Sequence, residues 1–186
     1  MMGALAATLL PLGFLIVLFG GGAHFLRNNI EQDGEAPINR TLFYVSKYSI
    51  LVLWGAMILQ SLGIGISLFE VPPLFQIIGL LSWCFGFALL YIGRFEMGRS
   101  FRLGTPKELT SLKVDGLFGL SRNPMYVGMY ATVVASALYT LNPVVIVLGA
   151  FVIAIHHSIV LAEEVHMQKV FGQEYLDYRN RVRRYV

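Results

Sequence analysis

Three polar residues stand where a long apolar segment begins. The sequence GLFGLSRNPMY, residues 116–126, brings Arg122, Asn123 and Tyr126 to the start of residues 123–162, which contain no Asp, Glu, Lys or Arg. Pro is favoured at the first position of a helix and Asn is a preferred capping residue before it, so a helix is predicted to begin at Pro124. A helix start carries unpaired N–H groups and a partial positive charge. Together with Arg122, it could bind an anion.

Two adjacent carboxylates, Glu163 and Glu164, follow the apolar segment. The Asn-Pro step at residues 142–143 is a turn signal that divides this segment into two helices. Two helices joined by a short turn pack side by side, so the second should return beside the start of the first. Arg122 is then the nearest cationic partner for the carboxylates. Each residue alone could be only a helix cap or a membrane-edge anchor, but together they suit a small zwitterionic or cationic cofactor.

The elements that must position these residues are predicted to be transmembrane helices. The chain of 186 residues is 56% hydrophobic and only 13% charged, whereas soluble proteins carry about twice that charged fraction. A helix needs roughly 20 apolar residues to cross a bilayer, and the charge-free runs predict an all-α membrane protein. Five spans are expected, near residues 4–24, 48–69, 73–94, 124–141 and 143–163.

The distribution of basic residues predicts the orientation. With five spans, all 14 Lys and Arg residues fall in the segments 24–47 and 94–123 and in the tail after Leu161, on one side of the membrane. The positive-inside rule makes this side cytoplasmic and the N-terminus external. Basic and apolar residues alternate in the 94–123 loop, which is expected to form a cytoplasmic cap with the C-terminal segment. We expect a single membrane domain: residues 1–93 form an N-terminal three-helix part, and residues 94–186 hold the site.

Other kinds of site find little support in the sequence. Cys84 is the only cysteine, which argues against a disulfide framework or a thiolate metal cluster, and no metal site or nucleic-acid partner is expected. His156 and His157 lie 100° apart on a helix and would not easily face one metal. They are expected to be neutral and bonded to other helices, or alternatively to line a tunnel for an acceptor. The C-terminal stretch RNRVRRYV is interpreted as a lipid-headgroup anchor.

Three motifs occur in order in the C-terminal half: GRSFRLGTP at 98–106, DGLFGLSRNPMYVG at 115–128 and EEVHMQKVFGQEYLDY at 163–178. On these motifs the chain resembles the isoprenylcysteine carboxyl methyltransferase and phospholipid methyltransferase superfamily of integral membrane enzymes. The resemblance implies S-adenosylmethionine as methyl donor, bound at the cytosolic face between the last two helices and the C-terminal segment.

The resemblance also implies which residues bind the donor. Arg122, Asn123 and Tyr126 should hold its methionine end, and Glu163 and Glu164 should lie near its ammonium, its ribose or the reaction centre. The residues expected to enclose the adenine are Gly116, Leu117, Phe118, Tyr175 and Tyr178. The carboxyl methyltransferases of the superfamily usually have His where this chain has Asn123. Asn cannot titrate, so an obvious general base is missing.

Methyl transfer to a lipophilic acceptor is the function these features favour. A sulfonium donor carries its own leaving group, so the enzyme needs mainly to align the reactants and exclude water. Arg122 is expected to position the acceptor or the donor carboxylate, and Glu164 to orient or deprotonate the nucleophile. The acceptor could be a prenylated cysteine carboxylate, a phospholipid amine, a thiol or an isoprenoid phenol. The membrane would be the plasma membrane in a prokaryote and the endoplasmic reticulum in a eukaryote.

Two alternatives remain open at this point. One is a membrane reductase of the sterol-reductase type that uses NADPH, although such enzymes are usually longer. The other is a small membrane protein without catalytic activity. Binding of S-adenosylmethionine, of NADPH or of neither would separate the three.

Overall fold

The computed structural model describes residues 2–27, 36–98 and 111–186, with side chains only for residues 3–18 in the first of these ranges. Within these ranges every regular element is a helix, which confirms the all-α prediction. The elements are α1 (Met2–Arg27), α2 (Arg40–Ser61), α3 (Pro73–Met97), the 3-10 helix η2 (Gly116–Gly119), α4 (Pro124–Thr140), α5 (Pro143–Phe171) and α6 (Gln173–Arg181).

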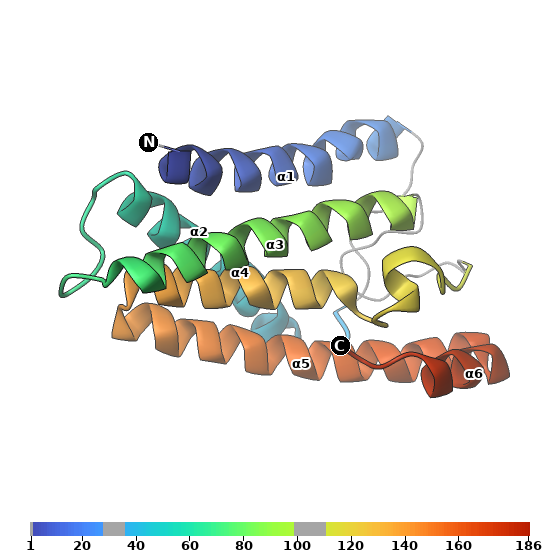
Figure 1. Ribbon diagram of the computed structural model, residues 1–186. Helices are drawn as coiled ribbons and strands as arrows, with labels where there is room; N and C mark the ends of the chain where they lie inside the picture. The colour runs from blue at the N-terminus through green and yellow to red at the C-terminus, as the bar shows by residue number, and fades with distance from the viewer. Residues whose placement is uncertain (1, 28–35, 99–110) are drawn as a thin grey trace.

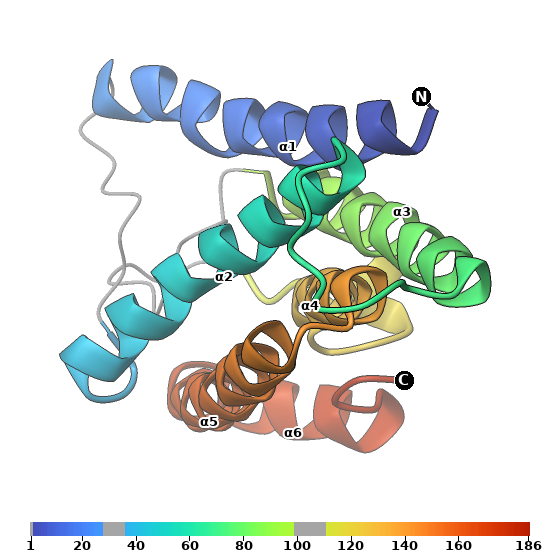
Figure 2. The ribbon, with the colours of Figure 1, turned by 90° about the vertical axis from the view of Figure 1, so that its left-hand side faces the viewer.

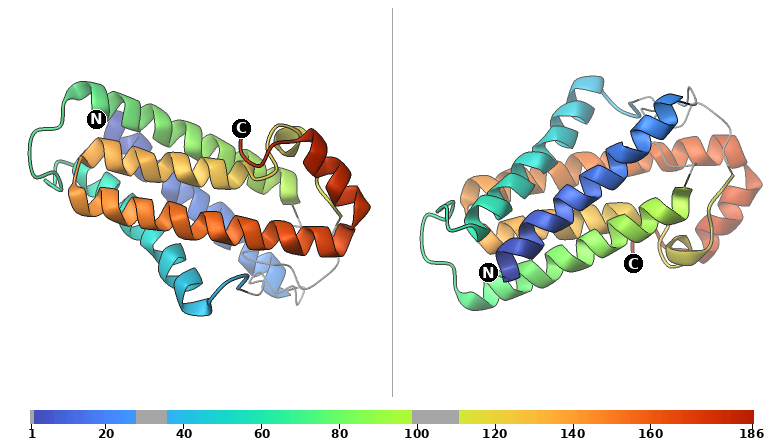
Figure 3. Two further views of the ribbon diagram at one scale, coloured as in Figure 1. Left: turned by 90° about the horizontal axis from the view of Figure 1, so that it is seen from below. Right: turned by 90° about the horizontal axis from the view of Figure 1, so that it is seen from above.

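Four long helices lie alongside one another and a fifth crosses them. In Figure 1, α1, α3, α4 and α5 run across the molecule one below the other, and α2 passes behind. Figure 2 shows α2 running diagonally from α1 towards α5. The short helix α6 folds back at the end of α5 (Figure 3), at the end of the bundle opposite the N-terminus.

Three of the helices are long and apolar enough to cross a membrane: α2, α3 and α5. In α1 the apolar part found is residues 3–18, and α4 has 17 residues. On α3 the side chains of Ile77, Leu81 and Phe85 are 58%, 65% and 55% exposed, at the spacing of one helix face. An apolar stripe of this kind suits contact with lipid. The chain is therefore an integral membrane protein, while the count of five spans and the orientation stay predictions.

The span expected at residues 48–69 is wrong at both ends, because α2 begins eight residues earlier, at Arg40, and ends at Ser61. The side chain of Asn39 accepts hydrogen bonds from the N–H groups of Thr41 and Leu42, so the helix starts within the polar stretch. Beyond its end, Gly63 has a φ of 84°, a left-handed conformation that Gly adopts without steric cost.

Helix α5 is longer than expected. The Asn142-Pro143 start is confirmed, and the Asn142 side chain accepts from the N–H groups of Val144 and Val145. The helix then continues past the expected end at residue 163 to Phe171, where Gly172 follows with a φ of 53°. Residues 163 and 164 are therefore inside a helix and not at its C-terminus. Two carboxylates at a C-terminus would be repelled by the negative end of the helix dipole, and most of this repulsion is absent here.

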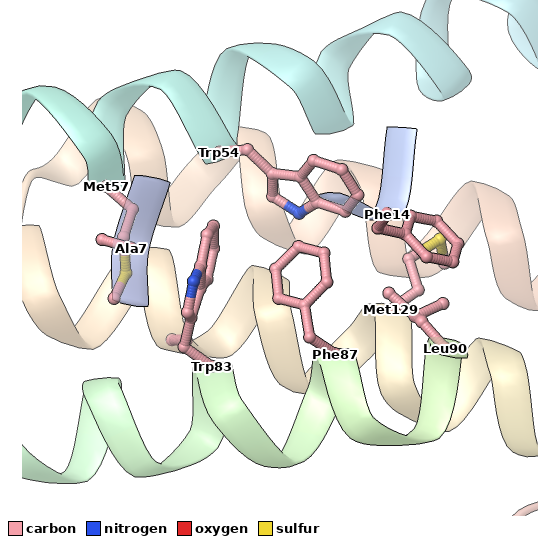
Figure 4. Close-up of a cluster of buried hydrophobic side chains, with 9 residues drawn as sticks. Ala7, Phe14, Trp54, Met57, Trp83, Phe87, Leu90 and Met129 are labelled. Atoms are coloured by element: carbon pink, nitrogen blue, oxygen red, sulfur yellow. The ribbon is translucent and has the colours of Figure 1, made fainter. Parts of the chain in front are cut away.

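An aromatic cluster joins the N-terminal helices to the rest of the bundle (Figure 4). Phe14 of α1, Trp54 of α2 and Phe87 of α3 meet with ring centroids 4.9–6.3 Å apart. The indole N–H of Trp54 donates to the hydroxyl of Thr132 in α4 at 3.0 Å, so this buried polar group is satisfied. The buried residues of the cluster are Ala7, Phe14, Trp54, Met57, Trp83, Phe87, Leu90, Met129 and Ala135.

Two glycines allow α3 and α4 to approach closely. A Cβ atom on Gly86 would lie 2.6 Å from the carbonyl oxygen of Gly128, and a Cβ on Gly128 would lie 2.7 Å from that of Gly86. Small residues at such a contact are typical of membrane helix pairs, because association depends on close van der Waals packing. This contact fixes α4 against α3 and thereby positions the start of α4, where the polar residues lie.

Candidate functional site

A buried ion pair joins the start of α4 to α5. Arg122 precedes α4, and its Nη2 and Nε lie 2.9 and 3.2 Å from Oε1 of Glu164. The two side chains are only 8% and 10% exposed. The pair forms because α5 returns alongside α4, so the predicted meeting of Arg122 with the carboxylates is confirmed for Glu164.

Asn123 occupies the expected position before α4 but does not cap the helix with its side chain. Its Nδ2 instead donates to Oε1 of Glu164 at 3.1 Å and to the backbone oxygen of Arg184 at 3.2 Å. A neutral amide can share the carboxylate with Arg122, because it adds a donor without a second charge. The predicted helix start at Asn123-Pro124 is confirmed, although the side chain of Asn123 bonds to Glu164 and not to the N–H groups of the helix.

Residues 182–185, here called the tail, fold back over this pair. The backbone N–H of Arg122 donates to the carbonyl of Arg183 at 2.9 Å, and Nη1 of Arg122 donates to the carbonyl of Val182 at 2.6 Å. The hydroxyl of Ser121 donates to the carbonyl of Arg184 at 3.2 Å. The interpretation of the C-terminal stretch as a lipid-headgroup anchor stays a prediction for its exposed arginines, Arg181 and Arg183, while the backbone of the tail contacts the ion pair. Backbone carbonyls make most of these contacts, so residue types gave little signal for them.

Arg184 is the site residue that sequence analysis missed. Its Nη2 and Nε donate to Oε2 of Glu164 at 3.0 and 3.1 Å, and this bonding raises the pKa of Arg184. Glu164 thus accepts hydrogen bonds on both oxygens, from Arg122, Asn123 and Arg184. Arg184 stands among other arginines in the C-terminal stretch, and nothing in the pattern distinguishes it.

Glu163 has different neighbours from Glu164. Its Oε2 accepts from the phenol of Tyr126 at 3.0 Å. Seven residues before it, on the same face of α5, Nδ1 of His156 lies 2.7 Å from the hydroxyl of Ser46 in α2. Among the residues that the structure describes, no ion pair to Glu163 is found. The two carboxylates therefore lie on neighbouring faces, with Glu164 towards the tail and Glu163 towards Tyr126.

The two adjacent histidines also divide between these faces. His156 bonds to α2 as described, and Nδ1 of His157 lies 2.7 Å from the hydroxyl of Tyr185 in the tail. The Tyr185 hydroxyl is also 3.4 Å from that of Tyr130 in α4. The prediction that the histidines bond to other helices is confirmed for His156, whereas His157 bonds to the tail, which is not helical.

The residues expected around the adenine lie in η2 and α6. The hydroxyl of Tyr178 donates to the carbonyl of Phe118 at 2.6 Å, which ties α6 to η2. The N–H of Leu117 donates to the carboxylate of Glu96 in α3 at 2.9 Å, and Gly116 has a φ of 60°. Burial raises the pKa of the Tyr178 phenol.

Tyr175 lies in α6 close to the ion pair. The residue is 2% exposed. Burial together with the nearby Glu164 charge raises the pKa of its phenol, while Arg122 opposes the shift. Glu164, Arg122, Asn123 and Tyr175 therefore form one group, while Tyr126 and Glu163 adjoin it. Of the 94–123 loop, residues 99–110 lie outside the described residues, so the predicted cap can be followed only in part.

Comparison with known proteins identifies relatives among methyltransferases. A family model described as phospholipid methyltransferase matches residues 74–174, from α3 to the start of α6. Protein-S-isoprenylcysteine O-methyltransferases from Rattus norvegicus and Mus musculus are 30% identical over 108 residues, or 56% of this chain. The aligned part spans 38% of the length of each of these relatives. No solved structure matches the chain. Since the family model covers more than half of the sequence, the chain belongs to the phospholipid methyltransferase family.

Proposed function

We propose that this chain is a membrane methyltransferase that transfers a methyl group from S-adenosylmethionine to a lipophilic acceptor. The observation that carries the proposal is the buried group of Arg122, Asn123 and Glu164. It lies at the junction of α4, α5 and the tail, within the part of the chain that the family model matches. Family membership does not favour the NADPH-dependent reductase considered above.

The donor's amino-acid end carries one ammonium and one carboxylate, and the group at Glu164 offers both complementary charges. Arg122 and Asn123 supply hydrogen-bond donors for a carboxylate, and Glu164 supplies an acceptor for an ammonium. The described residues of η2 and α6 expected to contact the adenosine part are Gly116, Leu117, Phe118, Tyr175 and Tyr178. Arg122 already bonds to the backbone and to Glu164, so it suits the binding of the donor better than recognition of a moving acceptor.

The two carboxylates suit different tasks in this proposal. Glu164 accepts hydrogen bonds from two arginines and an amide, which lowers its tendency to accept a proton. Glu163 accepts one hydrogen bond from Tyr126 and is the better group to orient or deprotonate an acceptor. In the transfer, the nucleophile's electron pair forms the new bond to the methyl carbon while the sulfur–methyl bond breaks. The sulfur keeps the electron pair of the broken bond, and any proton lost by the nucleophile passes to Glu163.

The acceptor is proposed to reach the site from the bilayer, while the donor enters from the cytoplasmic side. The named relatives methylate an isoprenylcysteine, and the family description names phospholipids. A prenylated carboxylate, a lipid amine, a thiol and a lipid phenol are the acceptor classes to compare.

The test is methyl transfer from labelled S-adenosylmethionine to a total lipid extract and to a prenylated cysteine, with mass spectrometry of the product. We expect the wild-type protein to label a lipid-soluble product, and Arg122→Ala and Glu164→Gln to abolish labelling. Glu174→Gln, at an exposed position on α6, is the matched control and should label normally. Normal labelling by both site variants would show that the site assignment is wrong, and absence of any labelled product with the wild type would contradict the proposed function.

A further inference from the structure

The two arginines on Glu164 differ in how firmly they are held. Arg122 donates to Glu164 and also to the carbonyls of Val182 and Arg179, and its side chain is 8% exposed. The guanidinium of Arg184 donates to Oε2 of Glu164, and its side chain is 36% exposed. Arg184 is therefore the partner that a ligand can displace at lower cost.

The backbone of the tail does not depend on this second ion pair. Ser121 and Asn123 both donate to the carbonyl of Arg184, and the N–H of Arg122 donates to the carbonyl of Arg183. These bonds remain if the Arg184 side chain leaves Glu164. The guanidinium can thus change its partner while the tail stays in place.

We propose that Arg184 is a donor-binding residue that exchanges Glu164 for the carboxylate of the methyl donor. The donor's ammonium takes the place of the guanidinium at Oε2 of Glu164, and the donor's carboxylate takes the guanidinium. This inference rests on the proposed function and adds to it a residue of the donor site.

Charge balance favours the exchange. A buried carboxylate that loses a cationic partner is strongly destabilised, so Arg184 cannot simply leave Glu164. An α-amino acid group replaces the lost cation and supplies an anion to the released arginine. Every charge then keeps a partner of opposite sign. A ligand without the carboxylate would leave the released Arg184 without an anionic partner.

The test is a binding cycle with S-adenosylhomocysteine and its decarboxylated analogue, measured by calorimetry on the full chain in detergent. The wild type should bind S-adenosylhomocysteine about tenfold or more tightly than the analogue, as expected for a charged hydrogen bond. Arg184→Ala should weaken the binding of S-adenosylhomocysteine about tenfold and leave the binding of the analogue nearly unchanged, so that the preference falls to the part that Arg122 and Asn123 supply. Arg184→Lys keeps the charge without the planar fork and should give an intermediate preference.

Arg183→Ala is the matched control, because Arg183 is the neighbouring arginine and is exposed. It should keep the wild-type preference. Thermal unfolding without ligand checks that each variant is folded, and Arg184→Lys and Arg184→Gln carry the comparison if the alanine variant does not fold.

The outcomes separate the two proposals. If Arg184→Ala weakened the binding of both ligands equally, the arginine would only stabilise the site. If the variant bound the ligands more tightly than the wild type, the arginine would block the site. Either result overturns this inference and leaves the proposed function standing. If the wild type binds neither ligand, the donor and hence the proposed function are wrong.

Discussion

Glu163 and Glu164 are adjacent in sequence but have separate surroundings, because consecutive residues on a helix point 100° apart. Glu164 faces Arg122 and Arg184 and its side chain is 10% exposed, whereas Glu163 meets the phenol of Tyr126. Replacing either carboxylate by an amide keeps its size and removes its charge. The two substitutions should affect stability differently, because Glu164 balances the buried charge of Arg122, whereas Glu163 accepts a hydrogen bond from Tyr126.

We predict that Glu164→Gln lowers the stability of the protein on the order of 3 kcal/mol, because a buried arginine loses its counterion. Glu163→Gln should cost about 1 kcal/mol or less, the value of one hydrogen bond. Thermal unfolding in detergent measures both, with Glu174→Gln as the exposed control. Equal losses for the two variants would contradict the separation of the two environments.

The same two variants should divide binding from turnover. Glu163→Gln is expected to bind S-adenosylmethionine with nearly wild-type affinity and to lose turnover, since the group facing the acceptor is changed. Glu164→Gln is expected to lose donor affinity itself. Calorimetry combined with the labelled-methyl assay measures both quantities, and a loss of donor affinity in Glu163→Gln would argue against its assignment to the acceptor.

At the scale of the elements, the site depends on how closely the helices approach. The contact between Gly86 and Gly128 holds α4 against α3, and the return of α5 alongside α4 brings Glu164 to Arg122. The 3-10 helix η2 is held between α3 and α6 through Glu96 and Tyr178. The geometry of the site therefore depends also on the contact between Gly86 and Gly128, which contributes no chemical group to it.

Gly86→Ala tests this dependence. The added methyl group would meet backbone atoms of α4 that cannot move aside easily, so we expect destabilisation of about 1–3 kcal/mol and weaker donor binding. Gly55→Ala is the control: its Cβ would meet nothing within 4 Å, and alanine favours the helix. Thermal unfolding of the two variants gives the comparison. A Gly86→Ala protein as stable as Gly55→Ala would show that the helices are not tightly packed there.

At the scale of the whole molecule, the bundle has two distinct ends. The turn between α4 and α5 lies at one end, and α6 with the site lies at the other (Figure 1). The basic residues predict that the end with the site faces the cytoplasm. A soluble donor could then reach the site from the cytoplasm, and a membrane-bound acceptor could reach the same site from within the bilayer.

Cysteine labelling measures this orientation. In a Cys84→Ser background, cysteines placed at Glu70 and at Glu174 lie at exposed positions near opposite ends of the bundle. We expect a membrane-impermeant maleimide to label Glu70→Cys in intact cells and Glu174→Cys only after permeabilisation. The reverse pattern would place the site on the outside.

The amino-acid sequence alone determined the class of the fold, the helical hairpin of α4 and α5, and the meeting of Arg122 with Glu164. These follow from apolar length, charge distribution and the Asn-Pro steps, which are local properties of the chain. The start of α2 was misplaced, because the Asn39 side chain begins a helix within a polar stretch. Only the tertiary structure decided that Asn123 bonds to Glu164, that the two carboxylates face different neighbours, and that Arg184 joins the site. These contacts involve backbone carbonyls and side chains brought together by folding. The 100° between consecutive helical residues separates the two carboxylates, but it does not determine which neighbours each of them meets.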